Sequence, residues 1–556
     1  MTLARGDICV FEDAYPSPND PDYHLCQGSQ LSKVDLYGRF VFYLSRNSIQ
    51  DYVDNRERYE DPHSILIPKY DAEIAKGGVL KGVPFMVGVE DEDAREESAL
   101  KRDIVDYVLG TFMRSNLIFP VHDDPTPWKN LEEGAKAMKI AGSKHLPEPV
   151  TEWDGVDVTS DDTIAHMCFA GLAGSRVEMV EPGSEPAKTN KTIYFKADFG
   201  FMGGLGTREG YEQFGAIAYF GESLDLVKIY WSHAGMDVYP DSPHWNHVKW
   251  VFRCSALVGI TAVEHLLENH MIYSNIGSTT SRETLPKNHP IRRLMKPFNH
   301  RTPTVNRGAL HLLMPEYSLL HRTVSLTFDG VKNAFLYALK TVRYQPNPMG
   351  RFRPILKSLG DRFPFAKDGS DFYDIVHDFA ASYIGIYYKD DIDLRRDHHL
   401  KIFWGDLKEY FKSSSNLPAF DQITMAEFID VFACYVFHVT GFHHVVGNVA
   451  EYLMQPDFAA ARIRPMVEVS DVEASMYGLL IAIFTGSKAP LLMNNFEHLL
   501  LKDEHLEATT AVFRDFQQNL TDFSIEIDRR NVARKEEGRW TYNGFDPRRM
   551  LSSVAI

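Results

Sequence analysis

The sequence predicts a mainly α-helical protein with one small β region ahead of a long, histidine-bearing helix. Apolar residues recur at three- and four-residue spacing over much of the chain, above all after residue 245. Three short runs between residues 192 and 232 are rich in β-branched and aromatic residues and are separated by glycine, which is typical of strands. With 44% apolar and 24% charged residues over 556 positions, the chain can bury a large core.

The elements are expected in a simple order. Residues 1–98 are rich in loops and are expected to pack on a single large domain formed by residues 99–556. A first helix is expected at 99–117, and the runs TIYFKADFGF, FGAIAYFG and LVKIYWS are expected to be the strands. Long helices are predicted at 245–275, 328–342, 371–388, 424–456, 471–486 and 498–520. The charged run 525–540 is predicted to be a solvated surface segment, and the apolar tail MLSSVAI is predicted to dock into the body.

Charge and cysteine content narrow the partners and the compartment. A formal net charge of −17 argues against nucleic acid as the main partner, because phosphate binding needs basic patches. The five cysteines are odd in number and form no CxxC pair, which favours a reduced, cytoplasmic protein. The N-terminus lacks a signal-peptide pattern. The apolar stretches near 428–446 and 476–485 look too short or too polar for a bilayer span, so no transmembrane segment is expected. A transient membrane contact remains compatible with the sequence.

The segment HLLENH places His265 and His270 five residues apart on a predicted helix. In an ideal α-helix these two side chains diverge around the axis. One π-helical turn would bring them onto the same face, and such turns cluster at functional sites. The spacing alone is a weak indication of a metal site, because paired histidines on a helix are commonly core or surface residues.

The segment HHVVGN provides a second pair, His444 and Asn448, which are four residues apart and share a helical face. The surrounding sequence is apolar, and His438, His443 and His444 make this stretch a candidate for a buried functional helix. A buried imidazole and a buried amide need partners, and His444 and Asn448 can satisfy that need by bonding each other. Together with the first segment they offer three imidazoles and one amide, a set without cysteine that suits iron or manganese.

These segments resemble the lipoxygenase family. The family's Trp-x-x-Ala-Lys pattern appears here as Trp245, Val248 and Lys249. Its two histidines separated by four residues fall on His265 and His270. The resemblance covers about residues 100–556 and includes HPIRRLMKPFNHRT (289–302). It implies a large helical catalytic domain of the lipoxygenase type and a metal held by His265, His270, His444, Asn448 and the terminal carboxylate of Ile556.

The resemblance also implies an activity: dioxygenation of a polyunsaturated fatty acid that has a cis,cis-pentadiene, with O2 as co-substrate and a lipid hydroperoxide as product. One non-heme iron ion is the implied cofactor, with manganese as the alternative. No catalytic side chain is expected beyond the metal and its bound hydroxide. The aligned channel segment TVNRGALHLLM places Gly308, Ala309 and Leu313 in the substrate-binding wall. An alanine at 309 resembles members that form S products.

This sequence also departs from the family pattern. The family's N-terminal β-sandwich is not expected in residues 1–150, and Ala256 stands where the family usually has aspartate. Thr261 and Glu451 replace glutamines that surround the metal ligands in many members, and they are expected to tune the metal. Glu451 is expected to accept a hydrogen bond from the amide of Asn448. The departures leave two alternatives open: a hydroperoxide isomerase or oxidase of another polyene with the same fold, and a binding protein without metal.

Overall fold

The computed structural model describes residues 151, 156–188, 191–300, 302, 305–306, 309, 320, 323–410, 417–453, 455, 457–469 and 490–554. Within these residues the protein is mainly helical and has one small antiparallel sheet, which confirms the predicted fold class. The predictions for residues 1–98, for the helix at 99–117 and for the helix at 471–486 lie outside the described residues.

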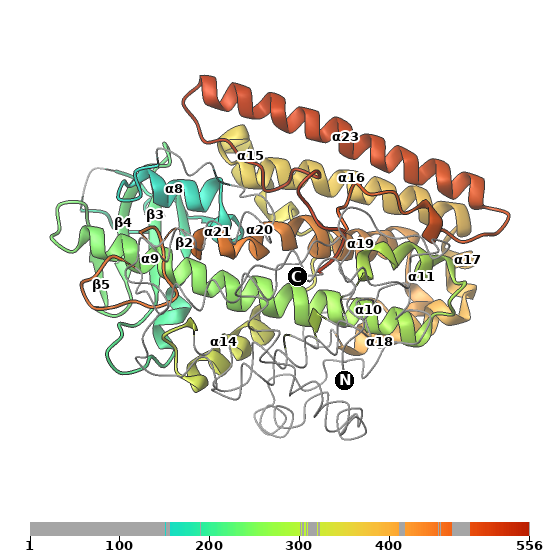
Figure 1. The fold of residues 1–556 in the computed structure, drawn as a ribbon, viewed down its shortest axis with the longest axis horizontal. Coiled ribbons are helices and arrows are strands. Elements are labelled where there is room, and N and C mark those ends of the chain that lie inside the picture. Colours follow the sequence, from blue (N-terminus) through green and yellow to red (C-terminus); the bar gives the residue numbers. More distant parts are fainter. Residues whose placement is uncertain are drawn as a thin grey trace, which may run out of the picture.

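One long helix runs through the centre of the molecule (Figure 1). It consists of α9 (Trp245–Ile260), a π-helical segment η4 (Thr261–Ser274) and α10 (Asn275–Thr284), which follow one another without a break. Every residue of α9 from His247 onward is buried. A helix that is buried on all sides belongs to the core of a large domain, so this helix can position functional side chains rigidly.

A second long helix packs against the first and supplies the other half of the candidate site. It comprises α19 (Met425–Phe437), a π-helical turn η9 (His438–Phe442), α20 (His443–Gly447) and α21 (Val449–Leu453). A capping box formed by Thr424 and Glu427 begins it. Both η9 and α20 contact η4, so the two π-helical segments lie together in the core.

These two helices are long and apolar enough to cross a membrane, which corrects the expectation that no segment meets this test. The first spans Trp245–Arg282 and the second Met425–Leu453. In the most apolar 18-residue window of each, 89% and 67% of the residues are buried inside the protein. Burial of this extent is what core helices show, and it explains their hydropathy without a bilayer.

The predicted β region is an antiparallel sheet at one end of the molecule (Figure 1). Its strands are β1 (Val177–Met179), β2 (Phe195–Asp198), β3 (Ala216–Phe220), β4 (Leu226–Trp231) and β5 (Met236–Val238), in that order across the sheet. Gly215, just before β3, has a φ of +114°, and a Cβ there would lie 2.5 Å from the backbone nitrogen of Gly203. Helix α9 packs across β3 and β4, so the sheet supports the start of the central helix.

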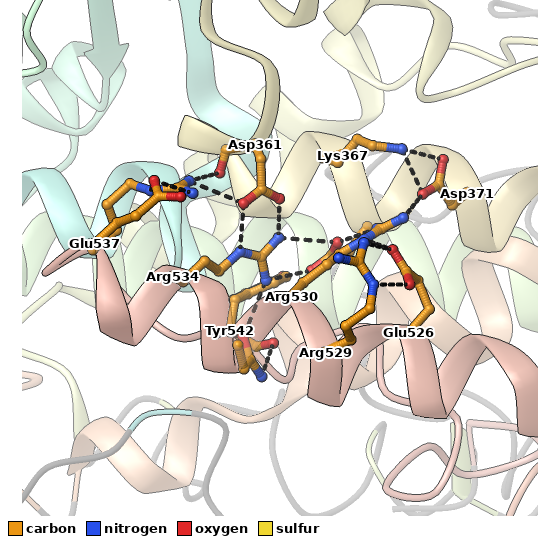
Figure 2. Close-up of polar contacts among 12 residues, drawn as sticks. Asp361, Lys367, Asp371, Glu526, Arg529, Arg530, Arg534, Glu537 and Tyr542 are labelled. Atoms are coloured by element: carbon orange, nitrogen blue, oxygen red, sulfur yellow. Dashed lines mark hydrogen bonds and ion pairs between the residues drawn. The ribbon is translucent and has the colours of Figure 1, made fainter.

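Two long helices form an outer layer, α16 (Pro364–Tyr387) and α23 (Leu506–Glu536), which lie side by side (Figure 1). Ion pairs connect them, as Figure 2 shows for Arg530 with Asp371 and for Arg534 with Asp361 before α16. The side chains of Arg534 and Asp368 are fully buried and 3.0 Å apart. Most of 525–540 is exposed or half-buried, as predicted, and Ile527 and Arg534 are its buried residues. Arg530 and Arg534 depart from the prediction, because they face carboxylates around α16.

The remaining elements surround these layers. The helices are α8 (Asp162–Phe169), α11 (Pro290–Met295), α14 (Phe328–Thr341), α15 (Arg353–Leu359), α17 (Asp391–Arg396) and α18 (His398–Tyr410), with 3-10 turns η2 (Leu172–Arg176), η3 (Gly200–Gly204), η5 (Pro297–Asn299), η6 (Gly350–Phe352), η7 (Gly360–Arg362), η8 (Phe420–Gln422) and η10 (Glu497–Leu499).

Candidate metal centre

The π-helical segment η4 brings His265 and His270 together. Their Nε2 atoms lie 3.1 Å apart and their rings meet at 72°. A π-helix bonds residue i to i+5, so residues five apart fall close together on its surface. The sequence-based expectation that a π-helical turn would align these two side chains is confirmed.

The third imidazole comes from His443, the first residue of α20. Its Nε2 lies 3.1 Å from Nε2 of His270. One ligand atom from each of His265, His270 and His443 can be chosen so that all three lie within 4.8 Å of one another. Among the residues that the structure describes, these are the only three histidine, cysteine or acidic side chains grouped closely enough to hold a metal ion. We call them the histidine trio.

In this geometry His443, and not its neighbour His444, lies with the other two histidines, and the role of His444 as a metal ligand stays a prediction. The turn before it, His438–Phe442, is π-helical and therefore contains an extra residue compared with an α-helical turn. The wider turn rotates the following residues about the helix axis, so the His443 side chain faces His265 and His270. The Nε2 atom of His444 is buried with no hydrogen-bond partner in the described part of the chain, and its electrostatic neighbours are Arg549 and Asp546.

Burial keeps the imidazoles neutral, which is the form that binds metal. Desolvation lowers the pKa of His270 to about 4. It also lowers the pKa values of His265 and His443 well below their ordinary range, and repulsion from the charged form of neighbouring histidines lowers them further. The Nδ1 of His270 is 3.0 Å from Oδ1 of Asn306. Because an amide oxygen only accepts, Nδ1 carries the proton and the Nε2 lone pair faces the other two rings.

Gly447 leaves space at the edge of the trio. A Cβ at this position would lie 3.1 Å from Nε2 of His265 and 3.5 Å from Nε2 of His443. Three neutral imidazoles with converging nitrogen atoms, one of them oriented by a hydrogen bond from its other nitrogen, fit a transition-metal ion. His265, His270 and His443 are thus the residues that would hold the metal.

Asn448 and Glu451 form a pair beside α20. The Nδ2 group of Asn448 donates a hydrogen bond of 2.8 Å to Oε2 of Glu451, and both side chains are buried. The expectation that Glu451 accepts a hydrogen bond from this amide is confirmed. The role of Asn448 as a metal ligand stays a prediction. In the family the ligand asparagine follows the third histidine by four residues. Counted from His443, that position is Gly447, and Asn448 lies one residue further along.

The other predicted site residues divide into two groups. The Thr261 hydroxyl donates to the carbonyl of Leu257 at 2.6 Å, within its own helix, where it begins the π-helical segment. Ala309 is buried in the core three residues after Asn306, which bonds to His270. Its role in substrate binding stays a prediction. Gly308, Leu313 and Ile556 lie outside the described residues.

Sequence reasoning missed two residues, His443 and Asn306. His443 is next to the expected ligand His444 in the sequence. The π-helical turn before them determines which of the two side chains faces His265 and His270. Asn306 also donates to the carbonyl of His270 at 2.7 Å, so a single side chain fixes both the ring and the backbone of this histidine. The sequence held no signal for Asn306, because its contact spans 36 residues.

Comparisons with known proteins agree with the fold. Residues 354–467 match the family model described as Lipoxygenase. The linoleate 9/13-lipoxygenase of Pseudomonas aeruginosa is 22% identical over 328 residues, which cover 52% of this chain and 45% of that protein. The epidermal-type polyunsaturated fatty acid (12S)/(13S)-lipoxygenase of Mus musculus is 22% identical over 294 residues, which cover 48% of this chain and 43% of that protein. The matched regions thus span less than half the length of these two relatives.

Among solved structures, a calcium-dependent 11R-lipoxygenase superposes with a TM-score of 0.65 at 17% sequence identity. The superposition covers 82% of this chain and 72% of the other. At this identity the likeness establishes a shared fold.

Proposed function

The chain belongs to the lipoxygenase family, and from that premise we propose that it is a dioxygenase that inserts O2 into a polyunsaturated fatty acid with a cis,cis-pentadiene. The proposed product is a lipid hydroperoxide, and the proposed cofactor is one non-heme iron ion, with manganese as the alternative. The observation that carries the proposal is the histidine trio, whose nitrogen atoms converge in the core of the domain.

When bound, the metal supplies one-electron oxidation of the substrate's central C–H bond. The protein's own contribution is to hold three uncharged donors in place. His265 and His270 come from one rigid helix, and His443 comes from the helix packed against it. Asn306 keeps the proton of His270 on Nδ1, so that Nε2 stays available as a donor.

The positive charge of the metal ion is expected to be balanced by one or two carboxylates. Neutral imidazoles add no charge, and a buried ion needs a partner of opposite sign. We propose the terminal carboxylate of Ile556 for this part. Glu451 adds a second buried carboxylate near the helix that carries His443, with its Oε2 held by Asn448. Its negative charge is expected to stabilise the higher oxidation state of the metal.

The substrate wall is proposed to include Ala309. Asn306 joins the segment that contains Ala309 to His270, so this segment lies against the metal helix. A buried, small, apolar side chain there suits a lipid channel.

One combined experiment tests the proposed function. The purified full chain is assayed for bound metal and for O2 uptake with linoleate, and the products are separated by chromatography. We expect about one iron or manganese ion per chain, O2 uptake and accumulation of a hydroperoxide. A metal-bearing protein that consumes fatty acid hydroperoxide without O2 uptake would instead be an isomerase. A protein that binds no metal would contradict the proposal and support a binding role.

A further inference from the structure

Residues 465–469 form an exposed turn on the surface, which we call the apolar turn. The backbone N–H of Val467 donates a hydrogen bond of 3.2 Å to the carbonyl of Arg464, which closes the turn. Met466 is 54% exposed, Val467 46% and Val469 39%. These are three of the ten large apolar side chains that are exposed in the described part of the chain. The exposed apolar surface is therefore concentrated in four consecutive positions.

The backbone of the apolar turn is strained at Met466. This residue has a φ of +57°, in the left-handed region that favours glycine. It follows Pro465, and a turn with proline second and a positive φ third ordinarily has glycine in the third position. Leu224 also has a positive φ, but its side chain is 6% exposed and packs in the core, which offsets the strain. The side chain of Met466 has no such packing, so its strain points to a contact outside the chain.

A cluster of arginines lies beside the apolar turn. Three guanidinium groups surround the ring of Tyr211, with their Cζ atoms 4.8–5.8 Å from the ring centre, and they belong to Arg208, Arg462 and Arg464. Arg208 and Arg464 are half-buried, whereas Arg462 is buried behind them. The whole chain has a formal net charge of −17, so this cluster is a local exception to its acidic character.

The acidic side chains near this cluster do not cancel its charge. Glu212 is buried, where it accepts hydrogen bonds from Trp231 and His247. Glu468 belongs to the apolar turn, and its Oε1 lies 3.4 Å from Nδ1 of the buried His247. Glu209 is exposed on the turn that carries Arg208. Three arginines against the two carboxylates of Glu209 and Glu468 leave this surface positive, and it combines that charge with exposed apolar side chains.

We propose that the apolar turn and the arginine cluster dock the protein on a lipid bilayer with an anionic surface. The side chains of Met466 and Val467 enter the boundary between headgroups and acyl chains, and Arg464 meets the phosphate groups. Tyr211 lies at headgroup level, where aromatic residues with a polar end are enriched. The docking role rests on the proposed function, because a fatty acid with a long hydrocarbon chain partitions into membranes and reaches the enzyme from there.

Co-sedimentation of the full chain with vesicles tests this proposal. We expect binding to vesicles of phosphatidylcholine and phosphatidylglycerol, at least tenfold weaker binding to phosphatidylcholine alone, and loss of binding as salt is added. The double variant Met466→Ser, Val467→Ser is expected to bind at least tenfold more weakly. The double variant Ile525→Ser, Val532→Ser is the matched control, because it removes two side chains of 62% and 60% exposure from α23. We expect its binding to be unchanged.

Met466→Gly is a second, independent variant. Glycine accepts the left-handed backbone without strain, so we expect a higher melting temperature together with weaker vesicle binding. The proposal would be overturned by the absence of vesicle binding, by binding that the variants of the apolar turn leave unchanged, or by an equal loss in the α23 control. It would also be overturned if light scattering showed a dimer that the Met466→Ser, Val467→Ser variant abolishes and vesicles were not bound.

Oxygen uptake with detergent-dispersed linoleate, measured on the same proteins, separates this proposal from the proposed function. We expect equal uptake in the wild type and in every variant, because the apolar turn is not part of the metal centre. Normal uptake without vesicle binding would overturn the docking role alone. Vesicle binding that depends on Met466 and Val467, in a protein without uptake, would support the docking role and contradict the proposed dioxygenase.

Discussion

The Nε2 atom of His443 lies 3.1 Å from Nε2 of His270, although the two residues are 173 positions apart in the chain. The contact joins two buried helices, and each of them is π-helical at or directly before the histidine. An extra residue in a helical turn changes which side chain faces a partner. The predictions below follow from this arrangement and from the groups that support it.

Gly447→Ala is expected to lower metal affinity. The added Cβ would lie 3.1 Å from Nε2 of His265, so the methyl group would displace that ring or occupy the space beside it. Gly405→Ala in α18 is the matched control, because a Cβ there meets nothing within 4 Å. Replacing glycine in a helix by alanine typically stabilises by about 0.5–1 kcal/mol. Metal titration and thermal unfolding of both variants test this, and unchanged metal affinity in Gly447→Ala would contradict it.

Asn306→Ala is expected to weaken metal binding by about 10–100-fold, as is typical when the partner of a ligating histidine is removed. The ring of His270 would lose the acceptor that fixes its Nδ1–H. Asn306→Asp keeps an acceptor at this place and is expected to retain most of the affinity. Competition with a chelator measures both. If Asn306→Ala bound metal as tightly as the wild type, Asn306 would have no part in orienting the histidine.

Ala309→Gly is expected to shift the products of linoleate oxygenation towards R stereochemistry, because loss of the methyl group opens space on one face of the proposed channel. Ala309 is buried beside the segment bonded to His270. Chiral chromatography of the hydroperoxides is the measurement. Identical positional and chiral composition in the two proteins would remove Ala309 from the substrate wall.

The ion pairs of Asp361 with Arg534 and Arg539 predict a loss of stability in acid. Burial alone would raise the pKa of Asp361, but hydrogen bonds and charges from Arg534 and Arg539 outweigh it and lower the pKa below 3.8. A lowered folded-state pKa stabilises the protein above the unfolded-state value, and this contribution is lost as the pH falls through the folded-state pKa. We therefore expect wild-type stability to decrease below about pH 4.

Asp361→Asn removes this carboxylate and tests its share. The variant is expected to have a lower melting temperature at pH 7, where Arg534 and Arg539 lose a charged partner. The difference from the wild type should shrink as the pH is lowered from 5 to 3. Asp515→Asn, at an exposed position of α23, is the control. A difference that stays constant over this pH range would show that ionisation of Asp361 does not contribute.

Sequence periodicity predicted the helices and strands whose apolar pattern is regular along their length. The buried helix around Trp245 and the strands Phe195–Asp198, Ala216–Phe220 and Leu226–Trp231 lie where their apolar patterns placed them. It failed where distant residues decide. The charged run after Ile525 continues α23, because Arg530 and Arg534 find carboxylates around α16 that local sequence does not show.

The candidate site was predictable only where it depends on local spacing, and not where it depends on contacts between distant residues. The alignment of His265 with His270 follows from their spacing and one π-helical segment. The choice between His443 and His444 depends on a single extra residue in the turn His438–Phe442, which no apolar pattern reveals because both neighbours are buried. Asn306 depends on a contact between separate elements.

The metal content of His443→Ala and His444→Ala tests the central claim most directly. Both variants are purified under the same conditions, with circular dichroism to check folding, and their bound iron and manganese are measured by elemental analysis. If the histidine trio binds the metal, His443→Ala loses most of it and His444→Ala keeps nearly the wild-type content. Full metal content in His443→Ala together with metal loss in His444→Ala would contradict the account.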